Sequence, residues 1–240
     1  MRSLRVVLMA ASVLSVVSLR AQTADEIINK YIDALGGKDK LASIKTVYTE
    51  YEMEVMGQQA SGSTWVVNGK GYKNVVDFAG QKIIQCFTDK GGWGVNPMMG
   101  QTTPEAMPAE QAQIGQGQMF VGGPLFNYAA KGNTVELIGK DTLNGKDAFK
   151  LKLKAKEGGE SIFWIDPATY YVLKTTVKSN VGGTDVETSV AFSNYKKNDF
   201  GYVMPANTEI NMAQGFTLNI TTKKTEINKE IDMKVFEMPK

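Results

Sequence analysis

Apolar positions near the start of the chain follow a helical period. Counted from Ile27, apolar residues recur after one, four, five and eight positions, which is the spacing of one helix face. They are Ile27, Ile28, Tyr31, Ile32 and Leu35. Thr23 or Asp25 can cap the N-terminus of this helix, and Gly36 can end it. The pattern predicts an amphipathic helix that needs a partner surface, followed by a short helical turn over residues 38–44.

From Thr46 onward the apolar period changes from helical spacing to alternation, which is typical of strands. Alternating runs cover residues 47–55, 63–68, 71–78, 82–89, 134–143, 148–155, 161–165, 170–179, 185–195, 208–212 and 216–226. Short turn signals such as Asn68-Gly69 and Asn144-Gly145 separate them. We therefore expect a mainly β fold with an antiparallel meander of about eleven strands, which must curl, split into two sheets or be covered.

One predicted hairpin, ESIFWIDPATYYVLKTTV at residues 160–177, is apolar on both faces. Asp166 can bond its own backbone and Pro167 fixes φ, so the pair marks the turn. Alternation puts Trp164 on one face and Phe163 and Ile165 on the other. A hairpin with one wet face would show polar residues at every second place, so both faces of this one are expected to be covered.

The segment from Gly91 to Ala130 shows no sustained period and is rich in Gly, Pro, Gln and Met. Residues 104–114 could form a short helix, interrupted near Pro108. The segment contains many large apolar side chains, which argues against a disordered linker. We expect a lid whose flexible methionines adapt to ligands of variable shape; the alternative is that they plug the end of a barrel.

The first 21 residues match an export signal. Arg2 and Arg5 precede an apolar stretch over residues 6–19, and Ala21 offers a cleavage point. Fourteen apolar residues are too few for a permanent membrane helix, and no later stretch is long enough. We expect residues 22–240 to form a single periplasmic domain without a transmembrane segment.

Composition argues against several classes of function. The chain has no histidine, which removes imidazole-based nucleophile activation and the usual imidazole metal ligands. The three arginines all lie in the first 20 residues, which leaves 24 lysines against 25 acidic residues. Nucleic-acid binding is therefore not expected. The lone Cys86 stands in an apolar run and is expected to be an inert core residue.

Acid pairs and glycine-rich runs could point to catalysis or phosphate binding, but both have simpler structural explanations. Acid pairs such as Asp25/Glu26 and Asp185/Glu187 could in principle serve a carboxylate-based hydrolase, but a helix start and one strand face explain them as solvated charges. The glycine-rich runs near Gly91 and Gly115 lack the Lys-Ser/Thr ending of a phosphate loop. We expect no enzyme activity, no catalytic residue, no metal and no cofactor.

Three stretches together resemble a known family. ADEIINKYIDALGGKDKLASIKTV, FWIDPATYYVLK and the closing IDMKVFEMP resemble the LolA/LolB-like outer-membrane lipoprotein-sorting proteins of the Bacteroidetes type. The resemblance implies an unclosed antiparallel β-barrel of about eleven strands wrapped around short helices, with an apolar cavity. It also implies a carrier that passes the acyl chains of lipoproteins from inner-membrane to outer-membrane sorting proteins.

Two departures from the family pattern matter. The arginine that holds the carrier's lid shut has no counterpart after the export signal, and the N-terminal cysteine that anchors the receptor branch is missing. The resemblance therefore favours a periplasmic carrier that binds acyl chains of lipoproteins or other lipids. A sensor or scaffold that binds a protein partner in envelope signalling is the alternative.

Large apolar side chains on the predicted strands and in the predicted lid are the candidates for the ligand-binding cavity. They are Trp65, Trp93, Met98, Met99, Met107, Met119, Phe120, Phe126 and Trp164.

Overall fold

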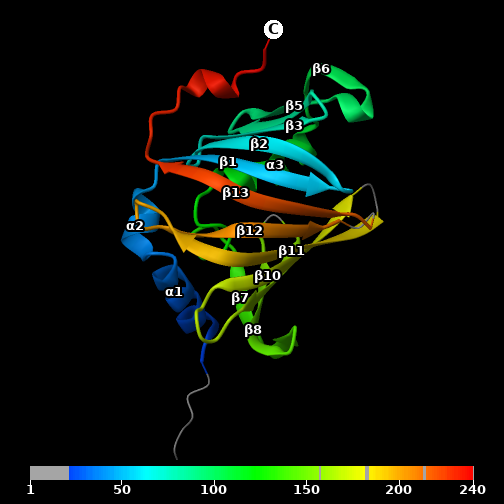
Figure 1. The fold of residues 1–240 in the computed structure, drawn as a ribbon. Helices are drawn as coiled ribbons and strands as arrows, with labels where there is room; N and C mark the ends of the chain where they lie inside the picture. Colours follow the sequence, from blue (N-terminus) through cyan, green and yellow to red (C-terminus); the bar gives the residue numbers. More distant parts are fainter. Residues whose placement is uncertain (1–21, 157, 182–183, 213–214, 240) are drawn as a thin grey trace, which may run out of the picture.

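The computed structural model describes residues 22–156, 158–181, 184–212 and 215–239. Within these residues the chain forms one thirteen-stranded antiparallel sheet with three α-helices and short 3₁₀ turns (Figure 1). The helices are α1 (Ala24–Ala34), α2 (Lys38–Ser43) and α3 (Ala109–Gln116). The strands are β1 (Thr46–Val55), β2 (Gln58–Val67), β3 (Gly71–Phe78), β4 (Gln81–Thr88), β5 (Gly91–Asn96), β6 (Gln101–Ala106), β7 (Thr134–Leu143), β8 (Lys146–Lys154), β9 (Glu160–Ile165), β10 (Val172–Val181), β11 (Thr184–Lys197), β12 (Val203–Asn211) and β13 (Thr217–Ile227).

The sheet is an open ribbon of hairpins. Its strand order is β6-β5-β4-β3-β2-β1-β13-β12-β11-β10-β9-β8-β7, so every neighbour follows in sequence except β1 and β13. Those two strands join the two meanders through a long register that runs from Val47 opposite Ile227 to Val55 opposite Leu218. The ribbon is not closed, because β6 and β7 form its two edges.

Helix α1 forms where the sequence predicts it. Thr23 is the N-cap, and its hydroxyl accepts a bond from the Glu26 backbone N–H while the Glu26 carboxylate accepts from the Thr23 N–H. The helix buries Ile28 and Ile32 and ends before Gly36. Gly36 has φ +124, and a Cβ there would lie 2.8 Å from the carbonyl oxygen of Gly201. Glycine is therefore required at this end of the helix.

The main core lies between the two N-terminal helices and the inner face of β8 and β9. Its fully buried members are Ile27, Leu41, Ile44, Leu125, Leu151 and Ile165. Because they come from α1, α2, the 121–128 segment and two strands, this core ties the N-terminal helices to the β7–β12 half of the sheet.

The hairpin at residues 160–177 has the predicted turn and cover. The Asp166 carboxylate accepts bonds from the backbone N–H groups of Ala168 (2.7 Å) and Thr169 (3.0 Å). Phe163, Trp164 and Ile165 are buried in succession, which confirms that both faces are covered.

The expected fold class is confirmed: the sheet is antiparallel and unclosed. All eleven predicted strands are present, β3 and β7 with the predicted bounds and the others with shifted ends. Residues 91–106, expected to be irregular, add β5 and β6. The predicted helix at residues 104–114 was also misplaced. Pro104 lies in β6, and α3 begins only after Pro108 because proline lacks the N–H that a helix interior needs. The expected export signal, residues 1–21, lies outside the described residues.

Candidate functional site

The segment after β6 packs against the β3–β6 half of the sheet. Helix α3 rests on the ring of Phe87 so closely that a Cβ at Gly115 would lie 2.2 Å from a ring carbon. The Gln116 side chain donates a 2.7 Å hydrogen bond to the carbonyl oxygen of Thr88. Close packing and one hydrogen bond therefore hold α3 at the end of β4.

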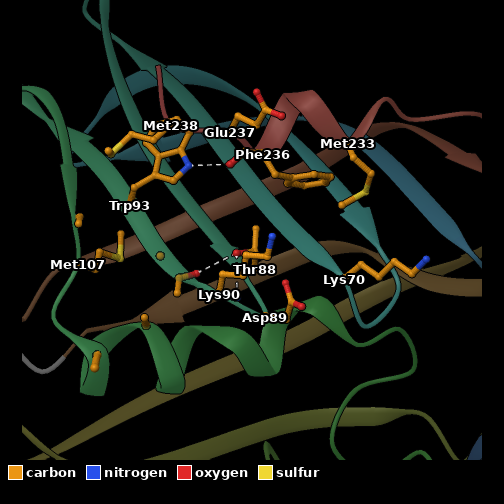
Figure 2. A pocket seen from close by; sticks show the side chains of 15 residues that line it. Lys70, Thr88, Asp89, Lys90, Trp93, Met107, Met233, Phe236, Glu237 and Met238 are labelled. Carbon is orange, nitrogen blue, oxygen red and sulfur yellow. Dashed lines mark hydrogen bonds between the residues drawn. The ribbon is translucent and has the colours of Figure 1, made fainter. Parts of the chain in front are cut away.

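A pocket of about 570 Å³ opens between α3, the β4–β5 hairpin and the C-terminal residues (Figure 2). Its large apolar lining groups are Trp93, Met107, Met233, Phe236 and Met238. Small residues also line it, among them Gly92, Ala109 and Ala112, and they leave space for a guest. The volume is within the usual range for small-molecule sites.

The C-terminal strap, residues 231–238, forms one wall of this pocket. The carbonyl oxygen of Phe236 accepts bonds from Trp93 Nε1 at 2.8 Å and from Cys86 Sγ at 3.3 Å. Lys73 Nζ donates to the carbonyl oxygen of Val235 at 2.9 Å. The Phe236 ring packs over Gly71, where a Cβ would lie 3.0 Å from it. The strap is thus fixed across β3, β4 and β5, and Figure 1 shows it in red at that end of the sheet.

Two of the methionines around the pocket are more exposed to solvent than apolar side chains usually are. Met233 is 45% exposed and Met238 is 47% exposed, while Met107 is half-buried. Figure 2 shows Met238 beside Trp93, Met233 on the far side of Phe236, and Met107 lower, on the side toward α3. Exposed apolar groups gathered around a hollow mark a binding surface, and flexible thioethers can repack around guests of different shape.

The rim of the pocket carries charges of both signs, Lys70 and Lys90 with Asp89 and Glu237. They give the mouth no strong net charge, so the apolar lining is the feature that selects a ligand.

Cys86 lies beneath the strap and does not contact solvent. Burial raises the pKa of its thiol to about 11. The thiol is therefore protonated at neutral pH, and the prediction of an inert core cysteine is confirmed.

Of the nine predicted cavity residues, Trp93 and Met107 line this pocket, but from opposite faces of β5: Met107 packs against Gly92 and Gly94, and Trp93 against Phe236. Trp65 is half-buried in the same cluster as Trp93 and Phe236. Its Cα is in register with Lys73, whose partner is Cys86, so it shares their face of the sheet.

Phe126 lines a different pocket of about 520 Å³, between α1 and residues 125–130. Ile28, Ile32 and Leu125 also line it. At its side, the hydroxyl of Tyr128 donates to the carboxylate of Asp25. This bond joins the segment after α3 to the first turn of α1.

Met119 is buried, and its carbonyl oxygen accepts a 2.9 Å bond from the Gly69 N–H. Phe120 is 45% exposed beneath the ammonium group of Lys131, 5.4 Å from the ring centroid. Met98 and Met99 stand out from the β5–β6 turn with exposed fractions of 59% and 83%.

Trp164 lies at the other end of the sheet, on the face opposite Phe163. Its indole nitrogen donates to Asp141 at 3.1 Å, and the ammonium groups of Lys150 and Lys174 stand 5.1 and 5.3 Å from its ring. Hydrogen bonds from Trp164 and then Lys150 lower the pKa of Asp141 to about 2. The nine residues therefore do not form one cavity, and their role in ligand binding stays a prediction.

Sequence reasoning missed the strap residues as part of the site. Apolar Ile231, Met233 and Val235 alternate just beyond the last strand, which is a detectable signal. Nothing local to these residues identifies β3–β5 as the surface they would cover.

Within the described part of the chain, no three His, Cys, Asp or Glu side chains are grouped as metal ligands would be. None of the helices in the described ranges is both long enough and apolar enough to cross a bilayer.

No protein-family model and no curated protein matches this sequence. Solved structures do match. A LolA superfamily protein from Nitrosomonas europaea aligns over 90% of this chain and 98% of its own, at 13% identity with a TM-score of 0.59. The fold is LolA-like.

Two further structures share the LolA-like fold. A domain assigned to outer membrane lipoprotein sorting in Vibrio parahaemolyticus covers 88% of this chain and 94% of its own, at 16% identity and a TM-score of 0.55. A DUF1329 family protein from Desulfovibrio piger covers 90% and 98%, at 14% identity and a TM-score of 0.57. At these identities the similarity shows the fold alone.

Proposed function

We propose that this protein is a periplasmic carrier that binds acyl chains of lipoproteins or other lipids for sorting to the outer membrane. The observation that carries the proposal is the methionine-lined pocket at the β4–β5 hairpin, which α3 borders from one face of the sheet and the C-terminal strap from the other. The LolA-like fold and the Vibrio parahaemolyticus domain assigned to lipoprotein sorting support it. The export signal predicted for residues 1–21 supports the periplasmic location.

The energetics suit a reversible carrier. Burial of a methylene group contributes about 0.8 kcal/mol, so a ten-carbon chain gains on the order of 8 kcal/mol. Ordering and association oppose that gain by roughly 4 kcal/mol or more. The remaining affinity is moderate, which allows both loading and release.

The pocket's architecture also suits chain binding without catalysis. Trp93 and Phe236 form a rigid wall, because the hydrogen bond between them is 2.8 Å long. Met107, Met233 and Met238 form an adjustable one. An acyl chain needs apolar contact and no fixed polar partner, which this combination supplies.

Binding of 11-dansylaminoundecanoic acid to the exported full-length protein tests the proposal. Ala109→Trp places an indole in the pocket from an exposed position on α3. We expect it to weaken binding about tenfold or more, a change of about 1.4 kcal/mol. Gln111→Trp, exposed on the same helix and outside the lining, is the matched control and should bind normally.

Equal affinity of the two variants and the unsubstituted protein would refute the assignment of this pocket. Native mass spectrometry of protein isolated from the periplasm then identifies the natural cargo. A lipid-free protein held tightly by another protein would favour the sensor or scaffold function instead.

A further inference from the structure

A hollow of about 610 Å³ lies on the outward face of β11, β12 and β13, away from the apolar pocket. These three strands lie side by side across the front of Figure 1. The turn between β7 and β8, with Leu143 and Asn144, borders the hollow on one side. We call it the outer groove.

The floor of the outer groove carries mostly polar side chains in regular rows, with Ala191 and Ile220 among its apolar members. The strand register forms three successive rows, each crossing β11, β12 and β13 in that order. The rows are Ser193–Asn207–Thr221, Ala191–Glu209–Asn219 and Ser189–Asn211–Thr217. The positions between them face the other side of the sheet, where Phe192 packs against the main core. Asparagine is depleted in strands, so three of them on one patch of two neighbouring strands is unusual.

Hydrogen bonds between and along the strands orient two of these amides, Asn207 and Asn211. Asn207 Nδ2 donates to Thr221 Oγ1 at 3.1 Å, and Asn207 Oδ1 accepts from Asn194 at 3.0 Å. Asn211 Nδ2 donates to Glu209 at 2.9 Å, and Asn211 Oδ1 accepts from Thr217 at 2.7 Å. An amide has two N–H donors and two acceptor lone pairs, so each retains hydrogen-bonding capacity toward a guest.

The walls and charges of the groove narrow the choice of guest. Glu209 is the one acid of the lining, while Lys146 and Lys174 lie at its edge. Lys174 stands over the Trp164 ring, and the half-buried Leu143 and Leu173 supply apolar contact. The polar floor does not suit an acyl chain, and two lysines beside an acid do not suit a polyanion.

We propose that the outer groove binds a neutral oligosaccharide, free or as the headgroup of a glycolipid. Sugar hydroxyls are closely spaced donors and acceptors that match rows of amide and hydroxyl groups. The apolar C–H face of a sugar ring would pack against Leu143 and Leu173. The outward face of an antiparallel sheet is commonly polar, but here the β7–β8 turn makes that face concave.

Titration of the ¹⁵N-labelled full-length protein with maltohexaose, laminarihexaose and chitohexaose tests the proposal. We expect at least one of these to give saturable shifts of backbone amide signals in β11–β13. Asn219→Ala, at an exposed position, should weaken binding about tenfold, since a site built for hydroxyls is left with an unmatched partner. Asn207→Ala should do the same.

Gln59→Ala is the matched control. Gln59 is an exposed amide on the same face, in register with Glu54, whose other partner is Asn219. It should leave the affinity unchanged. Absence of saturable shifts with all three sugars would overturn the proposal, as would equal affinity of Asn219→Ala and Asn207→Ala with the unsubstituted protein.

The source of the sugar is distinguished with octyl maltoside in the Ala109→Trp background, where the apolar pocket is filled. If octyl maltoside binds the outer groove more tightly than maltose does, the natural ligand is a glycolipid headgroup. If the two bind equally, it is a free saccharide. The three hexasaccharides carry no alkyl chain, and Ala109→Trp fills the apolar pocket in the octyl maltoside experiment, so the result is independent of whether the pocket binds acyl chains.

Discussion

The two halves of the sheet are filled differently. Where α1 and α2 pack against β8 and β9, large side chains such as Leu125, Leu151 and Ile165 are fully buried. At β4–β6, the walls are Gly92, Ala109 and Ala112, and a pocket remains. Both halves are antiparallel hairpins, so side-chain size rather than topology decides which half is a core and which can hold a guest.

The helices differ in the same way. Helix α1 has a complete capping box and buries three isoleucines. Helix α3 has Pro108 as N-cap without a side-chain cap bond, and it buries only Ala112 and Gly115. Helix α3 is therefore anchored by fewer and smaller buried side chains than α1, with its main support at Phe87 and Thr88.

The largest expected effect is on the packed half. Leu151→Ala should reduce the free energy of unfolding by about 2–5 kcal/mol, because a fully buried side chain is lost. Urea unfolding measures the change. Ile114→Ala on α3, at a 67% exposed position, is the control and should stay within about 0.5 kcal/mol. If Leu151→Ala lowered the free energy of unfolding only slightly, the β8–β9 half of the sheet could not be called the more tightly packed half.

The next largest effect concerns the contact between α3 and the Phe87 ring. Gly115→Ala should destabilise the protein by about 1–3 kcal/mol, since the new Cβ would lie 2.2 Å from the Phe87 ring. Gly117→Ala is the control, because a Cβ there meets nothing within 4 Å. Thermal unfolding of both variants measures the difference; equal stabilities would show that α3 is not seated on Phe87.

The strap provides a third test. Trp93→Phe removes the donor to the Phe236 carbonyl oxygen and should cost about 1–3 kcal/mol. Hydrogen exchange should accelerate in residues 231–238 more than in β8 and β9. Trp65→Phe is the control, since the bond to Phe236 comes from Trp93. Uniform acceleration throughout the chain would mean that the strap is not a separate unit.

The smallest effect is electrostatic and lies at the packed half. The folded-state pKa of Asp141 is about 2, below its ordinary value of 3.8, so its ionised form stabilises the fold above that ordinary value. This contribution should be lost as pH falls from about 4 to 2. A pH titration of tryptophan fluorescence should show a transition near pH 2 that Asp141→Asn abolishes. A transition unchanged in Asp141→Asn would exclude Asp141 as its cause.

The sequence predicts much of the fold because its signals are local. Alternation identifies eleven strands, and the spacing from Ile27 to Leu35 identifies α1. Strands β5 and β6 escape notice because Gly91, Gly92 and Gly94 interrupt one and Pro104 the other, while their pairing with β4 is a tertiary effect.

The candidate site was less predictable. Alternation assigns Trp93 and Trp164 to strand faces, but which face meets the strap or the core depends on contacts distant in sequence. Phe236 reaches Trp93 across 143 residues, and Trp164 meets Asp141 on another strand. Composition could indicate that methionines line a site, yet only the fold shows that Met107, Met233 and Met238 line the pocket and that Met98 and Met99 do not.

Photo-crosslinking with a diazirine-bearing long-chain fatty acid tests the central claim most directly, because it reports where the chain lies. The account predicts that mass spectrometry will find the label on peptides containing Met107, Met233 and Met238, and that Ala109→Trp will reduce it. Label confined to α1 and β8, or absent at saturating probe, would contradict the claim that this pocket holds an acyl chain.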